Sequence, residues 1–141
     1  MALQHPTAAS IEPNASLRGW WSVITTLLLA AIFIEAIFAG AMLSGVDWAR
    51  TAHGVTAAIL IASTLPAGLV SVVTLRRVAQ GPKLGLTLLS LAAAVFLQAA
   101  LGALSAKGAN LLWIHIPLGV ALFGFAVRAA AGARRLARND I

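Results

Sequence analysis

Cysteine is absent from the 141 residues of this sequence. Disulfides, thiolate metal sites and haem attached through thioether bonds are therefore excluded. Charged residues are also scarce, at 10% of the chain against about 25% in an ordinary soluble domain. Hydrophobic residues make up 60% of the chain, and the mean hydropathy is +0.93. This composition indicates an integral membrane protein in contact with a lipid bilayer.

Acidic residues are the scarcest charged type, with four Asp and Glu against ten Lys and Arg, which gives a net charge of +6. In a soluble protein such an excess would suggest nucleic-acid binding. Here most of the basic residues lie at the ends of apolar runs, which is how membrane topology is specified. We therefore expect no nucleic-acid partner.

A secretory signal is also lacking. The first residues, MALQHPTAASIEPNASLRG, are small and polar, without a basic start or an apolar core. We expect residues 1–18 to form a flexible cytoplasmic tail, residues 19–132 a transmembrane domain, and residues 133–141 a basic cytoplasmic tail.

Four apolar runs dominate the chain. Each is close to the about 20 residues that a helix needs to cross a bilayer, and a helix satisfies its own backbone hydrogen bonds in lipid. The connections are short, so successive helices should be antiparallel. The sequence predicts an all-α, up-down bundle of four transmembrane helices, at about residues 20–44, 51–75, 84–104 and 111–131.

Basic residues are unevenly divided between the two ends of these runs. Two of the loops contain only Arg50 and Lys107, whereas the other end has eight basic residues. By the positive-inside rule, both termini should be cytoplasmic, in a bacterial inner (plasma) membrane. Tryptophans should mark the interfaces, with Trp20 and Trp21 at one side and Trp48 and Trp113 at the other. The eight basic residues are Arg18, Arg76, Arg77, Lys83, Arg128, Arg134, Arg135 and Arg138.

Few polar residues lie within the runs, and an ionisable residue there is a functional hypothesis because its insertion costs about 2.5–3.5 kcal/mol. His53 and His115 lie near the outward ends of the second and fourth runs. Glu35 and Gln98 lie in the outer halves of the first and third. Either polar residue could be a proton or hydrogen-bond site.

These four residues suggest a weak internal repeat of two hairpins. Glu35 precedes His53 by 18 residues, and Gln98 precedes His115 by 17. Gly40 follows Glu35 by five residues and Gly102 follows Gln98 by four, so one single-residue gap aligns the halves. Such a repeat is parallel, with its twofold axis along the membrane normal. It places both histidines at one depth, facing the bundle axis.

Two imidazoles facing each other across a helical bundle suit a haem, with His53 and His115 as axial ligands of one haem b per chain. Small residues on these faces would leave room for the macrocycle, and basic residues at the outer mouth could pair with the propionates. The small residues are Gly40, Gly102 and Gly119, and the basic ones are Arg50 and Lys107.

The stretches LQAALGALSAKG (97–108) and LWIHIPLGVALFGF (112–125) resemble one half of the haem A synthase family. Proteins of this family look like two fused four-helix bundles. Each bundle has a histidine near the outer end of its second and fourth helices, and the pair can ligate one haem. The resemblance covers about residues 30–130 and implies ligation by His53 and His115, which are 62 residues apart.

The chain departs from this family at one important position. The family's catalytic half has a glutamate about one turn before its first histidine, where this chain has Trp48–Thr51 without an acid. The resemblance therefore implies haem binding without the oxidation chemistry. We therefore expect a protein that transfers electrons, or a haem-bearing subunit of a larger complex. Its partners would be membrane subunits, a second copy of the chain in a homodimer, or a quinone.

Two other functions fit part of the sequence. Glu35 in AIFIEAIFAG resembles the acidic residue of the small multidrug resistance family, which implies a proton-coupled exporter of cations. A cofactor-free assembly subunit would explain the small size and low polarity. In either of these, the histidines would be interfacial residues and Gln98 would bond between helices.

Overall fold

The protein is described by a computed structural model that covers residues 14–138. Four α-helices account for most of this part of the chain, and each is long and apolar enough to cross a membrane. The predicted all-α architecture of four spans is therefore confirmed. The helices are α1 (Asn14–Leu43), α2 (Ala49–Thr74), α3 (Gly81–Ala106) and α4 (Leu112–Arg138).

All four helices extend beyond the predicted spans at one end or both, most of all at the start of α1 and the end of α4. Helix α1 begins at Asn14 and not at Trp20, and α4 continues to Arg138 and not to Ala131. An apolar run ends at its first charged residues, but helical hydrogen bonding continues through Ala, Leu and Arg, which favour helices. Residues 14–18 and 133–138 are thus helical. The rest of the two predicted tails lies outside the described residues.

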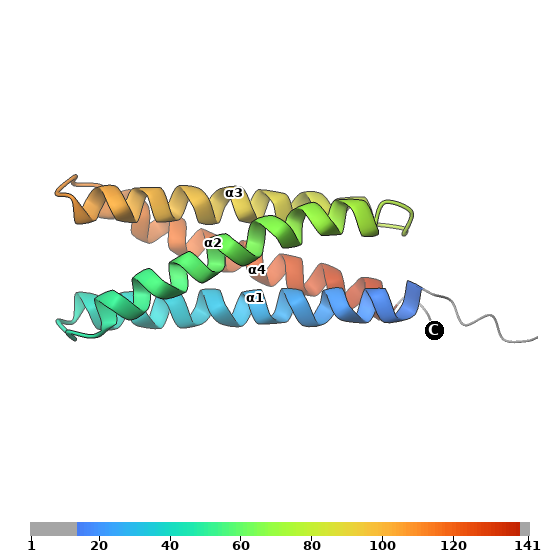
Figure 1. Ribbon diagram of the computed structural model, residues 1–141, viewed down its shortest axis with the longest axis horizontal. Helices are drawn as coiled ribbons and strands as arrows, with labels where there is room; N and C mark the ends of the chain where they lie inside the picture. Colours follow the sequence, from blue (N-terminus) through green and yellow to red (C-terminus); the bar gives the residue numbers. More distant parts are fainter. Residues whose placement is uncertain (1–13, 139–141) are drawn as a thin grey trace, which may run out of the picture.

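The helices form an up-down bundle in which each helix packs against two neighbours (Figure 1). Helices α1 and α3 are diagonal to each other, and so are α2 and α4. The start of α1, the end of α4 and the α2–α3 loop lie at one end of the bundle (Figure 1), which we name the basic end. The α1–α2 and α3–α4 loops lie at the other end, named the histidine end.

The hydrophobic core occupies only the half of the bundle near the basic end. Within residues 33–59 and 96–121, Ala49 is the only buried residue. The histidine half is therefore loosely packed, and its polar residues are not surrounded by a tight apolar core. The largest buried core side chains include Trp21, Leu28, Ile32, Leu60, Leu75, Leu88, Leu91 and Leu122.

Two glycines bring α2 and α3 close together within this core. A Cβ atom added to Gly68 would lie 2.8 Å from Leu89 Cδ2 and 3.2 Å from the Leu89 backbone. A Cβ added to Gly85 would lie 3.0 Å from Val72 Cγ2 and 3.1 Å from its Cα. Small residues at such contacts let backbones approach, which is the main route to helix association in lipid.

The turns at the histidine end confirm the internal repeat. Gly45 and Gly108 have φ of +82° and +98°, and each lies ten residues after its polar partner, Glu35 or Gln98. The next N–H donates to a carbonyl five residues back, from Val46 to Ala41 at 3.0 Å and from Ala109 to Leu104 at 3.1 Å. Both hairpins therefore end their first helix with the same left-handed glycine cap.

These caps relocate the gap in the repeat. Because the caps are equally spaced from Glu35 and Gln98, the extra residue of the first hairpin lies between Gly45 and His53, in the turn or the start of α2. Gly102 then corresponds to Ala39, and the pairing of Gly40 with Gly102 was wrong. Equal spacing within a helix preserves the face, whereas a shift of one residue rotates it by about 100°.

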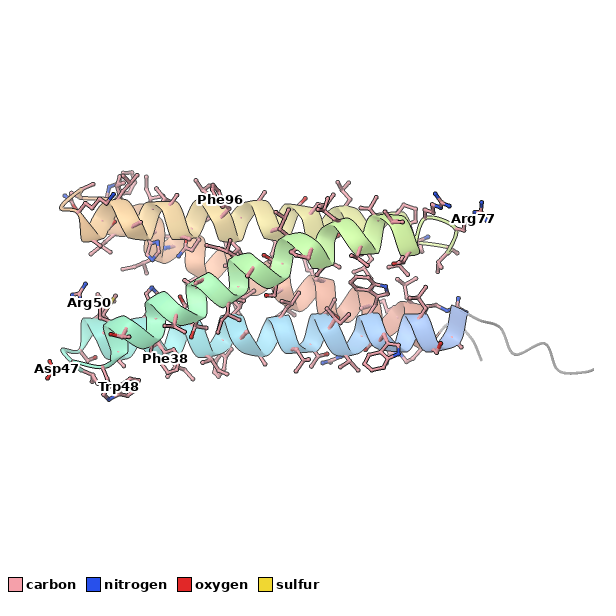
Figure 2. All side chains as sticks on the ribbon, in the orientation of Figure 1. Phe38, Asp47, Trp48, Arg50, Arg77 and Phe96 are labelled. Atoms are coloured by element: carbon pink, nitrogen blue, oxygen red, sulfur yellow. The ribbon has the colours of Figure 1, made fainter. Side chains whose placement is uncertain are left out.

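Aromatic and charged side chains mark both ends. Figure 2 shows Asp47, Trp48 and Arg50 at the histidine end and Arg77 at the basic end. Trp20, Trp48 and Trp113 are 66%, 60% and 70% exposed, as expected for residues in contact with the membrane interface. Trp21 differs from the expectation, because it is only 3% exposed and belongs to the core.

Candidate functional site

Four polar side chains, one from each helix, come together in the histidine half of the bundle. On the first hairpin, His53 Nδ1 lies 3.0 Å from Glu35 Oε1. The His53 and Glu35 side chains are 20% and 16% exposed. Glu35 and His53, which the sequence places 18 residues apart in one hairpin, are therefore in direct contact through a ring nitrogen and a carboxyl oxygen.

The second hairpin repeats this contact with different chemistry. His115 Nδ1 lies 3.1 Å from the backbone oxygen of Gln98, and Gln98 Nε2 donates to the His115 carbonyl at 2.9 Å. Gln98 Nε2 also lies 3.4 Å from His115 Nε2. His115 is thus held to α3 through both its ring and its backbone.

The contact of His115 assigns the proton on its ring. A carbonyl oxygen only accepts hydrogen bonds, so Nδ1 of His115 must carry the proton and Nε2 the lone pair. At His53, Nδ1 lies close to Glu35 Oε1 without the geometry of a hydrogen bond, so this contact assigns no tautomer. Metal-ligating histidines usually donate their second ring nitrogen to a carboxylate or a backbone carbonyl in this way. His115 therefore has the tautomer that leaves Nε2 as a ligand.

The two rings meet across the diagonal of the bundle. The centroids of the His53 and His115 rings are 6.5 Å apart, and the ring planes are inclined by 83°. Two metal–imidazole bonds of about 2.0–2.1 Å, with about 1.1 Å from each nitrogen to its ring centre, span about 6.3 Å. The observed separation matches that of two axial ligands on one metal ion.

The predicted glycines lie in this half but act differently from one another. A Cβ on Gly102 would lie 3.0 Å from His115 Cε1, and a Cβ on Gly119 would lie 3.0 Å from Gln98 Nε2. These two glycines therefore make room for the Gln98–His115 pair between α3 and α4. A Cβ on Gly40 would meet nothing within 4 Å, so Gly40 has open space beside it.

The two predicted basic residues lie at the outer margin. Arg50 is exposed in the first turn of α2, three residues before His53, and Lys107 is exposed at the end of α3. Within the described part of the chain, neither side chain has an ion pair. Both can reach an anionic group that sits at the histidine end.

Two buried oxygens of the cluster lack a hydrogen-bond partner among the described residues. They are Glu35 Oε2 and Gln98 Oε1, and the ring nitrogen His53 Nδ1 also has no hydrogen-bond partner. Buried polar atoms are nearly always satisfied, so these two oxygens indicate that water or a ligand donor belongs at the site. Residues 14–138 contain no cluster of three or more His, Cys, Asp or Glu that could bind a metal, whereas zinc normally takes three or four protein ligands.

Comparisons with protein-family models, with curated proteins and with solved structures find no match to the chain. The chain is therefore described as a four-helix membrane protein, and its function has to be inferred from the cluster itself.

One contact of this region was not predicted from the sequence. Phe33 of α1 and Phe123 of α4 pack with ring centroids 5.9 Å apart. Phe33 lies two residues before Glu35 along α1, nearer to the basic end of the bundle. Isolated phenylalanines in apolar runs carry no pairing information, so only the packed helices reveal this contact.

Proposed function

We propose that this protein is a membrane-embedded b-type haem protein, with His53 and His115 as the axial ligands of one haem b. The observation that supports this most is the diagonal pair of rings at a 6.5 Å centroid separation. His115 Nδ1 donates to the preceding helix, and His53 Nδ1 lies 3.0 Å from Glu35 of its preceding helix, which would leave each Nε2 for the iron.

The surroundings of the pair support the same proposal. The histidine half lacks the tight apolar core of the other half, so side chains there can rearrange around a large flat group. Ligation would replace the long 3.4 Å contact between His115 Nε2 and Gln98 Nε2. Arg50 and Lys107 would bind the propionates at the outer margin.

The resemblance to one half of the haem A synthase family agrees with this assignment but adds no chemistry. The turn before His53 has no glutamate, so oxidation of a haem side chain is not proposed. When bound with both axial positions filled, a haem supplies one-electron transfer and not oxygen binding. We therefore propose electron transfer, or a haem-bearing subunit, with a membrane subunit, a second copy or a quinone as partner.

The orientation is part of the proposal. Eight of the ten basic residues are at the basic end, which we place in the cytoplasm of a bacterial cell. The haem would then lie near the outer face of the inner membrane, and both termini would be cytoplasmic.

A reduced-minus-oxidised absorption spectrum of the detergent-extracted protein tests haem binding. We expect a low-spin b-type spectrum at about one haem per chain, since two imidazoles fill the axial positions. His53→Ala and His115→Ala should each abolish the low-spin form. His5→Ala is the matched control, because His5 precedes the first span and should leave the spectrum unchanged.

A colourless, folded protein after expression with added haem precursor would overturn the proposal and favour the cofactor-free assembly subunit. A low-spin spectrum that survives both histidine substitutions would overturn the ligand assignment. The exporter alternative rests on the half-buried Glu35. It predicts that cells expressing Glu35→Gln lose resistance to cationic drugs that the unmodified protein confers.

A further inference from the structure

A groove lies between α1 and α2 in the half of the bundle away from the histidines. It has a volume of about 330 Å³, at the lower end of the range for small-molecule sites. Ala67 lines it, about 21 Å along α2 from His53. The groove is therefore separate from the candidate haem site. Its walls include Leu17, Trp20, Trp21 and Ile24 from α1 and Ala67 and Val70 from α2.

The groove is apolar and open to the outside of the bundle. Trp20, Pro66 and Val70 line it and are exposed. Its other lining residues are apolar except Thr74, whose hydroxyl donates to the Val70 carbonyl of its own helix. In a membrane this face is in contact with lipid, so we expect an acyl chain to fill the groove along its length.

One polar atom of the groove wall has no partner. Trp21 is 3% exposed, and its Nε1 is buried without a hydrogen-bond acceptor among the described residues. An indole N–H can only donate, and a buried tryptophan usually finds an acceptor. This N–H is itself covered by the protein, so a lipid ester carbonyl in the groove can accept it only after the indole turns toward the groove.

Positive charge lies at the same end of the bundle as the groove. Thr74 is its last lining residue on α2, and the exposed Arg76 and Arg77 follow within three residues. The acidic residues of the described chain, Glu35 and Asp47, lie toward the histidine end. Basic pockets between transmembrane helices are recognised sites for anionic lipid headgroups.

We propose that this groove binds one anionic phospholipid. Its acyl chain lies between α1 and α2, its ester carbonyl accepts the Trp21 Nε1–H, and its phosphate binds Arg76 and Arg77. The depth is consistent, because Trp21 follows the exposed Trp20 near the basic end of α1, where tryptophans mark the membrane interface. This proposal is independent of the haem proposal.

Native mass spectrometry of the full-length protein, with equal phosphatidylglycerol and phosphatidylcholine added, tests the site. We expect one phosphatidylglycerol per chain, bound at least about fivefold more often than phosphatidylcholine. Arg76→Gln with Arg77→Gln should remove this preference. Trp21→Phe should lower occupancy about fivefold, as the loss of one neutral hydrogen bond does, but keep the preference.

The matched control is Arg135→Gln with Arg138→Gln, which removes two exposed charges from the same end on α4. It should leave the selectivity unchanged. An equal loss of selectivity in this control would show only a diffuse basic surface and overturn the site. A quinone or a second copy of the chain in place of the lipid would also overturn it, as would unchanged lipid retention in Ala67→Phe, which fills the groove.

Discussion

At the scale of single residues, the two histidines differ in what holds them. His53 faces the carboxylate of Glu35, whereas His115 donates to the backbone oxygen of Gln98. The repeat therefore presents one acidic side chain and one neutral backbone oxygen to two otherwise similar rings. Hydrogen bonds to ligating histidines tune the metal that they bind, so the asymmetry should be measurable in the bound haem.

We predict that Glu35→Gln raises the haem midpoint potential, because removal of a negative charge near the iron destabilises the ferric form. The expected shift is on the order of 60 mV, a tenfold change in a one-electron equilibrium. Potentiometric titration of the purified protein measures it. The reciprocal Gln98→Glu should lower the potential, and an unchanged potential in Glu35→Gln at full haem content would contradict the prediction.

Gly102 and Gly40 offer a second contrast between single residues. In Gly102→Ala the new Cβ would lie 3.0 Å from the His115 ring, so the ring must move away from Gln98. We predict at least about a tenfold loss of haem affinity, typical of disturbing the partner of a ligand. Haem retention during dilution, followed by the Soret absorbance, measures this.

Gly40→Ala is the matched control, since its Cβ would meet nothing within 4 Å. It should retain haem as the unmodified protein does. Equal losses in both variants would show that helix flexibility matters, and not the space beside His115.

At the scale of helices, the α2–α3 crossing should dominate stability. In Gly85→Ala the new Cβ would lie 3.1 Å from the Val72 Cα, a backbone atom that cannot rotate away. We predict a loss of about 1–3 kcal/mol in the free energy of unfolding relative to a matched control, as overpacked contacts show. Unfolding in mixed micelles, followed by circular dichroism, measures it.

Gly124→Ala on α4 is that control, because its Cβ would have open space. Both substitutions gain the same helix propensity, up to about 1 kcal/mol, so their difference isolates the packing effect. If the two variants unfold alike, the close approach of α2 and α3 contributes little to stability.

At the scale of the whole molecule, the absence of cysteine makes the proposed orientation directly testable. We predict that a single cysteine in Asp47→Cys or Lys107→Cys reacts with a membrane-impermeant maleimide on intact cells. Arg77→Cys should react only after the cells are opened, because the basic end faces the cytoplasm. Labelling of Arg77→Cys in intact cells would contradict this orientation and would show that the histidine end faces the cytoplasm.

The architecture follows almost entirely from local composition. Four runs of apolar residues, separated by short loops, leave a chain in lipid no alternative to four antiparallel helices. The spacing of Glu35, His53, Gln98 and His115 also predicted that the two histidines share one depth, because helix rise converts spacing into position along the axis. What failed was local: the helix ends at Asn14 and Arg138, and the burial of Trp21.

The partners of each side chain depend on contacts between helices, which spacing along the chain does not specify. Only the packed bundle places His115 on Gly102, joins Phe33 to Phe123, and assigns different neighbours to Gly40 and Gly102. These contacts depend on the rotation of each helix about its axis, because a shift of one residue along a helix rotates the direction of the side chain by about 100°. Composition and spacing therefore account for the spans and the depth of the polar residues, while interhelical packing decides which atoms meet.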